Sequence, residues 1–70
     1  MIRKGTVVKW KWGSGYAQGK VMDTFDHKIT KKIKGAEVTR NATTDDKALF
    51  IEQNDGDHVL KSESEVERVE

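Results

Sequence analysis

The chain has 70 residues, of which 34% are hydrophobic and 36% charged, and its formal net charge is +1. A chain of this length buries only about 60% of the surface that it exposes when unfolded, so we expect one domain, residues 1–70, with a thin core. The absence of cysteine excludes disulfides and thiolate metal ligands, and no apolar run is long enough for a signal peptide or a membrane span. We therefore expect a cytoplasmic protein that does not act at a membrane.

Charge is unevenly distributed along the chain. Residues 1–34 contain nine Lys or Arg and two Asp, a local charge of +7, whereas residues 52–70 contain two basic and seven acidic residues, a local charge of −5. Two interpretations stay open. The two ends form neighbouring strands whose charges cancel, or the first half presents a basic face to a polyanion.

The segment "VVKWKWGSGYAQGKV" predicts the first hairpin. Its apolar residues alternate with lysines, as in a half-buried antiparallel strand. A four-residue loop, residues 13–16, places Trp10 opposite Gly19 and Trp12 opposite Ala17. We favour this register because each indole then faces a small residue. The same alternation puts Trp10 in the core and Phe25 on the core side of the second strand.

Two further hairpins follow. Residues 29–39 read as a hairpin that turns at Lys34-Gly35 and sets Lys32 beside Glu37. It contains few apolar residues, so we expect it to project rather than to pack deeply. Residues 41–47 form a polar loop.

The segment "ALFIEQNDGDHVLK" predicts the third hairpin, with a two-residue turn at Asp55-Gly56. This turn pairs Ile51 with Leu60 and leaves Phe50 on the less buried side.

The C-terminal segment predicts a tight helical turn over residues 62–65 and a short closing strand over residues 66–69. If the closing strand lies beside the first strand, Lys9 and Lys11 lie near Glu65 and Glu67. Five or six short strands, no long helix and a glycine-rich bend indicate an all-β protein, a small antiparallel barrel.

Three segments in order, "VKWKWGSG", "KGAEVTRN" and "IEQNDGDHVLKS", resemble the hypervirulence-associated protein Tudor domain family, formerly a bacterial domain of unknown function. The resemblance extends from about Gly5 to Val69. It implies an SH3-like, Tudor-type barrel and supplies no biochemical activity, since a fold does not fix a function. The family often has a Pro-Ala-Tyr run before the fourth strand, where this chain has "DKALFIE". If that Tyr served an aromatic cage, Leu49 cannot.

Aromatic residues are the first candidates for a binding site. Tudor domains that recognise methylated lysine or arginine surround the cation with aromatic faces. With Trp10 assigned to the core, a partial groove of Trp12, Tyr16 and Phe50 is the candidate ligand site. The leading function is therefore a non-enzymatic binding module for a protein or peptide, with the ligand itself undetermined.

The alternative function is weak nucleic-acid binding through the second hairpin. Its candidate residues are Lys28, Lys32, Lys34 and Arg40. Lysines on a hairpin also keep it soluble and protect its edge strands from pairing with other chains. No feature of the sequence indicates recognition of specific bases.

No catalytic constellation is found, so we expect no enzyme, no metal and no cofactor. His27 and His58 are far apart and lack a cysteine partner, and "NDGD" lacks the spacing of a calcium loop. The oligomeric state is left open.

Overall fold

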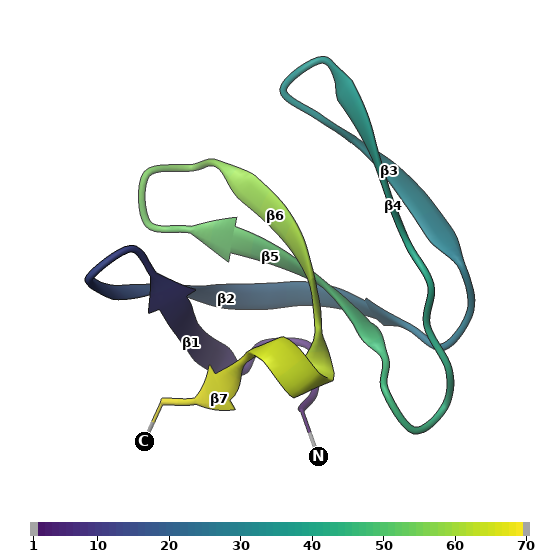
Figure 1. Ribbon diagram of the computed structural model, residues 1–70, viewed down its shortest axis with the longest axis horizontal. Coiled ribbons are helices and arrows are strands. Elements are labelled where there is room, and N and C mark those ends of the chain that lie inside the picture. The colour runs from purple at the N-terminus through teal and green to yellow at the C-terminus, as the bar shows by residue number, and fades with distance from the viewer. Residues whose placement is uncertain (1, 70) are drawn as a thin grey trace.

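A computed structural model describes residues 2–69 of the chain (Figure 1). Within these residues all strand pairs are antiparallel, which confirms the all-β prediction. Seven strands are present where five or six were expected, and the last has only two residues. The strands are β1 (Val7–Trp12), β2 (Gly15–Phe25), β3 (Ile29–Ile33), β4 (Ala36–Arg40), β5 (Ala48–Gln53), β6 (His58–Ser62) and β7 (Glu67–Arg68).

The strands form two sheets rather than one closed barrel. Five strands pair in the order β6-β5-β2-β1-β7, and β3 pairs with β4 in a separate two-stranded sheet. The β3–β4 hairpin stands to one side of the larger sheet, as its polar sequence predicted (Figure 1). The sheet stays open within residues 2–69 because the strands at its two edges, β6 and β7, are not paired with each other.

The first hairpin differs in register from the prediction. Trp10 faces Ala17 and Val8 faces Gly19, so the loop consists of residues 13–14 alone. The register is shifted by two residues, which leaves every side chain on its predicted face. The expectation that Gly19 is small to admit Trp10 was wrong. A Cβ at Gly19 would lie 2.6 Å from both the carbonyl oxygen of Glu52 and Cγ2 of Ile51, so the close neighbour is β5.

A β-bulge in β2 reverses the faces of its second half. Val21 pairs with Ile51 and Asp23 with Phe50, so the residue between them, Met22, is extra. Beyond this bulge, residues an even number of positions from Val21 no longer lie on the same face of the sheet as Val21. The prediction that Phe25 belongs to the core is therefore wrong, and its half-buried ring packs outside the core cluster.

The core is formed mainly by side chains from one face of β1, β2 and β5. Trp10 is 4% exposed, which confirms its predicted place in the core. The core cluster has six members, which come from three strands and from the residue after η1, a short 3₁₀ helix (Glu63–Glu65): Val8, Trp10, Val21, Leu49, Ile51 and Val66.

The β5–β6 hairpin is one residue out of the predicted register. Phe50 faces Leu60 and Ile51 faces Val59. The loop is longer than two residues because Gln53 accepts a hydrogen bond from the Gly56 amide (2.9 Å) and Gly56 adopts a φ of +89°. A type I turn followed by a left-handed glycine gives this three-residue loop. Phe50 remains on the less buried side, as predicted.

Two other local predictions are confirmed. The β3–β4 hairpin turns at Lys34-Gly35, with φ of +52° and +78°, and sets Lys32 opposite Glu37. Residues 62–65 form the tight turn that contains η1.

The last strand lies beside the first. Lys9 is the cross-strand partner of Glu67, which confirms that the basic and acidic ends of the chain meet. Glu65 behaves differently from the prediction: its Oε1 lies 2.9 Å from Nη1 of Arg40 on β4.

Candidate functional site

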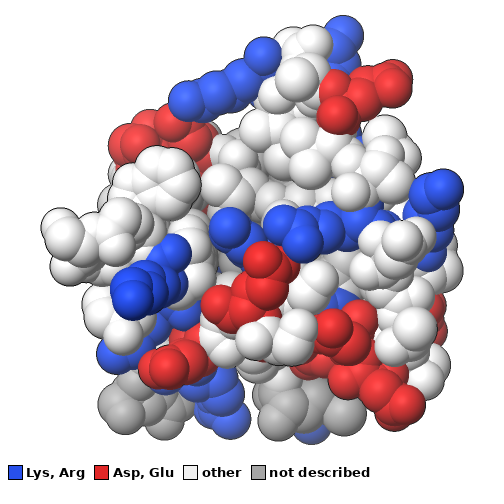
Figure 2. Space-filling model, in the orientation of Figure 1, with Lys and Arg blue, Asp and Glu red and all other residues white. Residues whose placement is uncertain are grey.

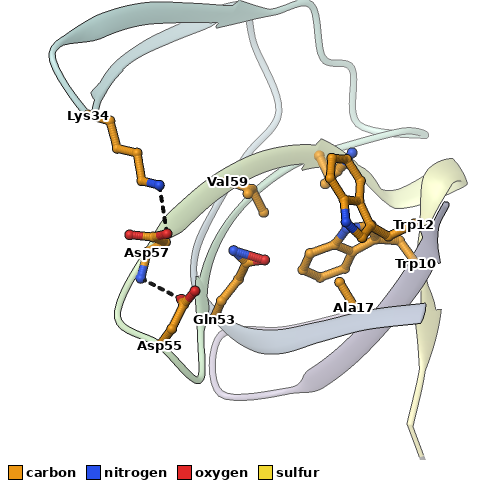
Figure 3. A pocket seen from close by; sticks show the side chains of 9 residues that line it. Trp10, Trp12, Ala17, Lys34, Gln53, Asp55, Asp57 and Val59 are labelled. Carbon is orange, nitrogen blue, oxygen red and sulfur yellow. Dashed lines mark hydrogen bonds and ion pairs between the residues drawn. The ribbon is translucent and has the colours of Figure 1, made fainter. Parts of the chain in front are cut away.

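A pocket of about 350 Å³ lies between the β1–β2 hairpin and the β5–β6 hairpin (Figure 3). Both hairpins and the β3–β4 turn contribute side chains to its wall. They are Trp10, Trp12, Ala17, Lys34, Gln53, Asp55, Asp57, Val59 and Lys61.

One end of the pocket is aromatic. Trp10 and Trp12 project from the same face of β1 because side chains alternate along a strand. Trp10 is held in the core, whereas Trp12, at the strand's end, keeps 72% of its surface exposed. Ala17 lies beside the indoles, and Val59 adds an apolar side chain farther along the wall (Figure 3). The pocket therefore has a buried indole and an exposed one.

The other end is acidic. The amide of Asp57 donates a 3.0 Å hydrogen bond to Oδ1 of Asp55, which fixes both residues in the β5–β6 loop. Oδ2 of Asp57 lies 2.7 Å from Nζ of Lys34. This hydrogen bond and the negative charge of Asp57 raise the pKa of Lys34 above its usual range. Gln53 lies between the acidic and the aromatic ends (Figure 3).

The pocket walls attract cations, and the ammonium groups of two lysines of the domain already lie against them. Nζ of Lys61 lies 5.9 Å from the centroid of the Trp10 ring, within reach of a cation–π interaction. Lys34 binds Asp57 at the opposite end. Two lysines thus balance Asp55 and Asp57, and the lining has a formal charge of zero.

A family model described as the hypervirulence associated proteins Tudor domain matches residues 5–66, nearly the whole chain. The chain belongs to this family. The match confirms the resemblance seen in the sequence and assigns an SH3-like fold to the domain. Searches of curated proteins and of solved structures each gave no match.

Leu49, which stands where the resemblance to the family suggested a tyrosine, is part of the core. Leu49 is fully buried in the main cluster. An aromatic residue at that position would have to be accommodated among the core side chains, so the cation-attracting groups of this pocket come from other elements.

The three aromatic residues predicted for the ligand site do not meet in this pocket. Trp12 lines it, whereas Tyr16 and Phe50 are absent from its wall. Tyr16 is 65% exposed on the opposite face of the hairpin, where Nζ of Lys9 lies 5.1 Å from its ring centroid. Phe50 stacks on His58 with ring centroids 4.9 Å apart.

Sequence reasoning missed the acidic end of the Tudor domain's pocket. The sequence pattern explains Asp55 and Asp57 by a hairpin turn and indicates no binding role for Gln53, Val59 or Lys61. The available signal was the placement of two aspartates on either side of Gly56, at a hairpin tip. Only the curvature of the sheet brings this tip opposite Trp12.

Two of the four basic residues predicted to bind nucleic acid form ion pairs within the Tudor domain. Lys34 binds Asp57, and Arg40 binds Glu65 and donates from Nε to the Leu60 carbonyl oxygen at 3.2 Å. Lys32 lies opposite Glu37, and Lys28 is exposed. Figure 2 shows basic and acidic side chains interspersed on the face that it presents.

The two histidines lie in separate exposed contacts. His27 Nδ1 is 3.2 Å from Oδ1 of Asp26, and His58 Nε2 is 3.8 Å from Oε2 of Glu52. Residues 2–69 contain no group of three or more His, Cys, Asp or Glu side chains placed to hold a metal ion. The same residues contain no helix long and apolar enough to span a membrane.

Proposed function

We propose that this Tudor domain is a non-enzymatic binding module that recognises a protein or peptide segment, and that its pocket receives a basic side chain of that partner. The observation that carries the proposal is the exposed indole of Trp12 at the mouth of a pocket whose far end bears Asp55 and Asp57. Large aromatic groups left in water beside a concavity are typical of binding surfaces.

The chemistry of the pocket favours a long side chain with a cationic end. Indole faces and Val59 offer an apolar wall to an aliphatic stem, and an indole also attracts a cation. The carboxylate of Asp57 accepts hydrogen bonds from an ammonium group, as its 2.7 Å contact with Lys34 illustrates. Lysine and arginine combine such a stem with such an end.

We expect Trp12→Ala to weaken binding of a short lysine peptide, with Tyr16→Ala as the matched control. The probe is the acetylated and amidated peptide Ser-Gly-Lys-Gly-Ser, and its partner is the same peptide with norleucine in place of lysine. The measurement is a nuclear magnetic resonance titration of the labelled domain. Tyr16 is also an exposed aromatic residue of the same hairpin but lies outside the pocket.

The expected result is saturable binding of the lysine peptide, weaker binding of the norleucine peptide, and a loss confined to Trp12→Ala. An equal loss in Tyr16→Ala would instead favour the outer face of β1 and β2. No difference between the two peptides would contradict recognition of a basic side chain.

Nucleic-acid binding through Lys28, Lys32, Lys34 and Arg40 stays the less favoured alternative. Affinity of this kind depends on phosphate contacts and falls with salt. Because Lys34 and Arg40 have acidic partners, we expect no binding of a labelled oligonucleotide tighter than about 10⁻⁴–10⁻⁶ M at physiological salt. Titration at two salt concentrations measures this. Submicromolar binding that is lost when the three lysines become Gln would reverse the ranking.

The other sequence-based expectations stay predictions. They are a cytoplasmic location, the absence of enzymatic activity and of a cofactor, and a domain that comprises the whole 70-residue chain.

A further inference from the structure

We propose that Lys34 is a built-in competitor for the pocket: its ammonium group occupies the acidic end in the free domain and must leave when a partner's basic side chain enters. This inference rests on the proposed function and adds a means by which the pocket is regulated. It assigns to the β3–β4 hairpin, which is separate from the main sheet, the role of a cap.

The turn of the hairpin presents Lys34 to the pocket. Lys34 and Gly35 occupy the turn with φ of +52° and +78°. From there the Lys34 side chain reaches across to the β5–β6 loop (Figure 3). Its Nζ lies 2.7 Å from Oδ2 of Asp57, and Lys34 forms part of the pocket wall.

The hairpin is attached in a way that allows this contact to be exchanged. β3 and β4 form their own sheet, so strand pairing does not join them to the other five strands. Side chains make the attachment instead. Nζ of Lys31 lies 5.1 Å and 5.2 Å from the ring centroids of Phe25 and Phe50, and Arg40 binds Glu65. These contacts lie away from the turn and can persist when Lys34 is released.

Charge balance makes the competition necessary. With Lys34 and Lys61 in place, the formal charges of the pocket lining sum to zero, so these charges together give an incoming cation no net Coulombic attraction. Release of Lys34 leaves a charge of −1 and frees a carboxylate oxygen for the ligand. The Lys34 side chain is 68% exposed, so its ion pair is weak and Lys34 is a competitor rather than a permanent block.

Two substitutions break the same ion pair and are expected to have opposite effects on binding of the lysine peptide. Lys34→Gln removes the competitor and keeps the carboxylate, so affinity should rise by a factor of about two to five, the range that an exposed ion pair allows. Asp57→Asn removes the carboxylate that both cations need, so affinity should fall. The control is Lys32→Gln, which removes an exposed lysine of the same hairpin that does not line the pocket.

The titrations use the whole domain and both peptides described above, and thermal melts verify that each variant is folded. A gain in Lys34→Gln for the lysine peptide, without a comparable gain for the norleucine peptide or in Lys32→Gln, supports the competition. If wild type binds the lysine peptide and Lys34→Gln binds it equally or more weakly, the competition is overturned while the proposed function stands. If neither binds it, both are overturned.

Discussion

Trp10→Ala is expected to lower the free energy of unfolding by about 3–5 kcal/mol, the largest loss that a single side-chain truncation should cause in this domain. Trp10 is 4% exposed and packs with Val8, Val21 and Ile51 in the core cluster. Folded domains have a total stability of only about 5–15 kcal/mol, and a short chain with a thin core lies toward the low end. The variant should therefore be largely unfolded near body temperature.

Trp12→Ala is the matched control, because it removes an equal side chain from the same face of the same strand. Trp12 is 72% exposed, so its loss should change stability far less. Urea unfolding followed by circular dichroism measures both variants. Trp10→Ala with the midpoint of wild type, or two variants with equal losses, would contradict the assignment of one indole to the core and the other to the pocket mouth.

The side-chain pattern of the strands could be predicted from the sequence, because alternation is local. It placed Val8 and Trp10 inside and Lys9 and Lys11 outside, which the structure confirms. The pairing of β1 with the C-terminal strand, expected from their charges and from the SH3-like fold, is confirmed as well. An error of two residues in the predicted loop length leaves each side chain on its predicted face of the sheet, whereas an error of one residue does not. The β5–β6 loop has one more residue than predicted, so Ile51 pairs with Val59 and not with Leu60.

The bulge at Met22 could not be predicted for a different reason. A bulge depends on how β2 bends between two partners, β1 and β5, and no residue type requires it at one position. The bulge turns Phe25 away from the core. The Phe25 ring lies instead beneath the ammonium group of Lys31. The side of the sheet that a residue faces becomes uncertain wherever a long strand changes partners.

The candidate site was only half predictable. Trp12 could be recognised as an aromatic residue at the exposed end of a strand. The acidic end of the pocket depends on the curvature that brings the β5–β6 loop toward β1, a long-range property of the whole sheet. Tyr16 is close to Trp12 in sequence but projects from the other face of the hairpin, as the pairing of Tyr16 with Lys11 requires.

Gly19→Ala is expected to destabilise the domain by about 1–3 kcal/mol or more, although it adds a single methyl group. An ideal Cβ at this position would lie 2.6 Å from both the carbonyl oxygen of Glu52 and Cγ2 of Ile51. The Ile51 side chain is fully buried and the oxygen is backbone, so neither can move without shifting β5 against β2. That pairing joins the two halves of the larger sheet.

Gly15→Ala is the control, since Gly15 lies in the same strand and a Cβ there meets nothing within 4 Å. Comparison of the two variants by urea unfolding isolates the close approach of β5 from the general effect of replacing glycine in a strand. Equal unfolding midpoints for Gly19→Ala and Gly15→Ala would contradict the close approach of β2 and β5, and with it the strand arrangement on which the pocket depends.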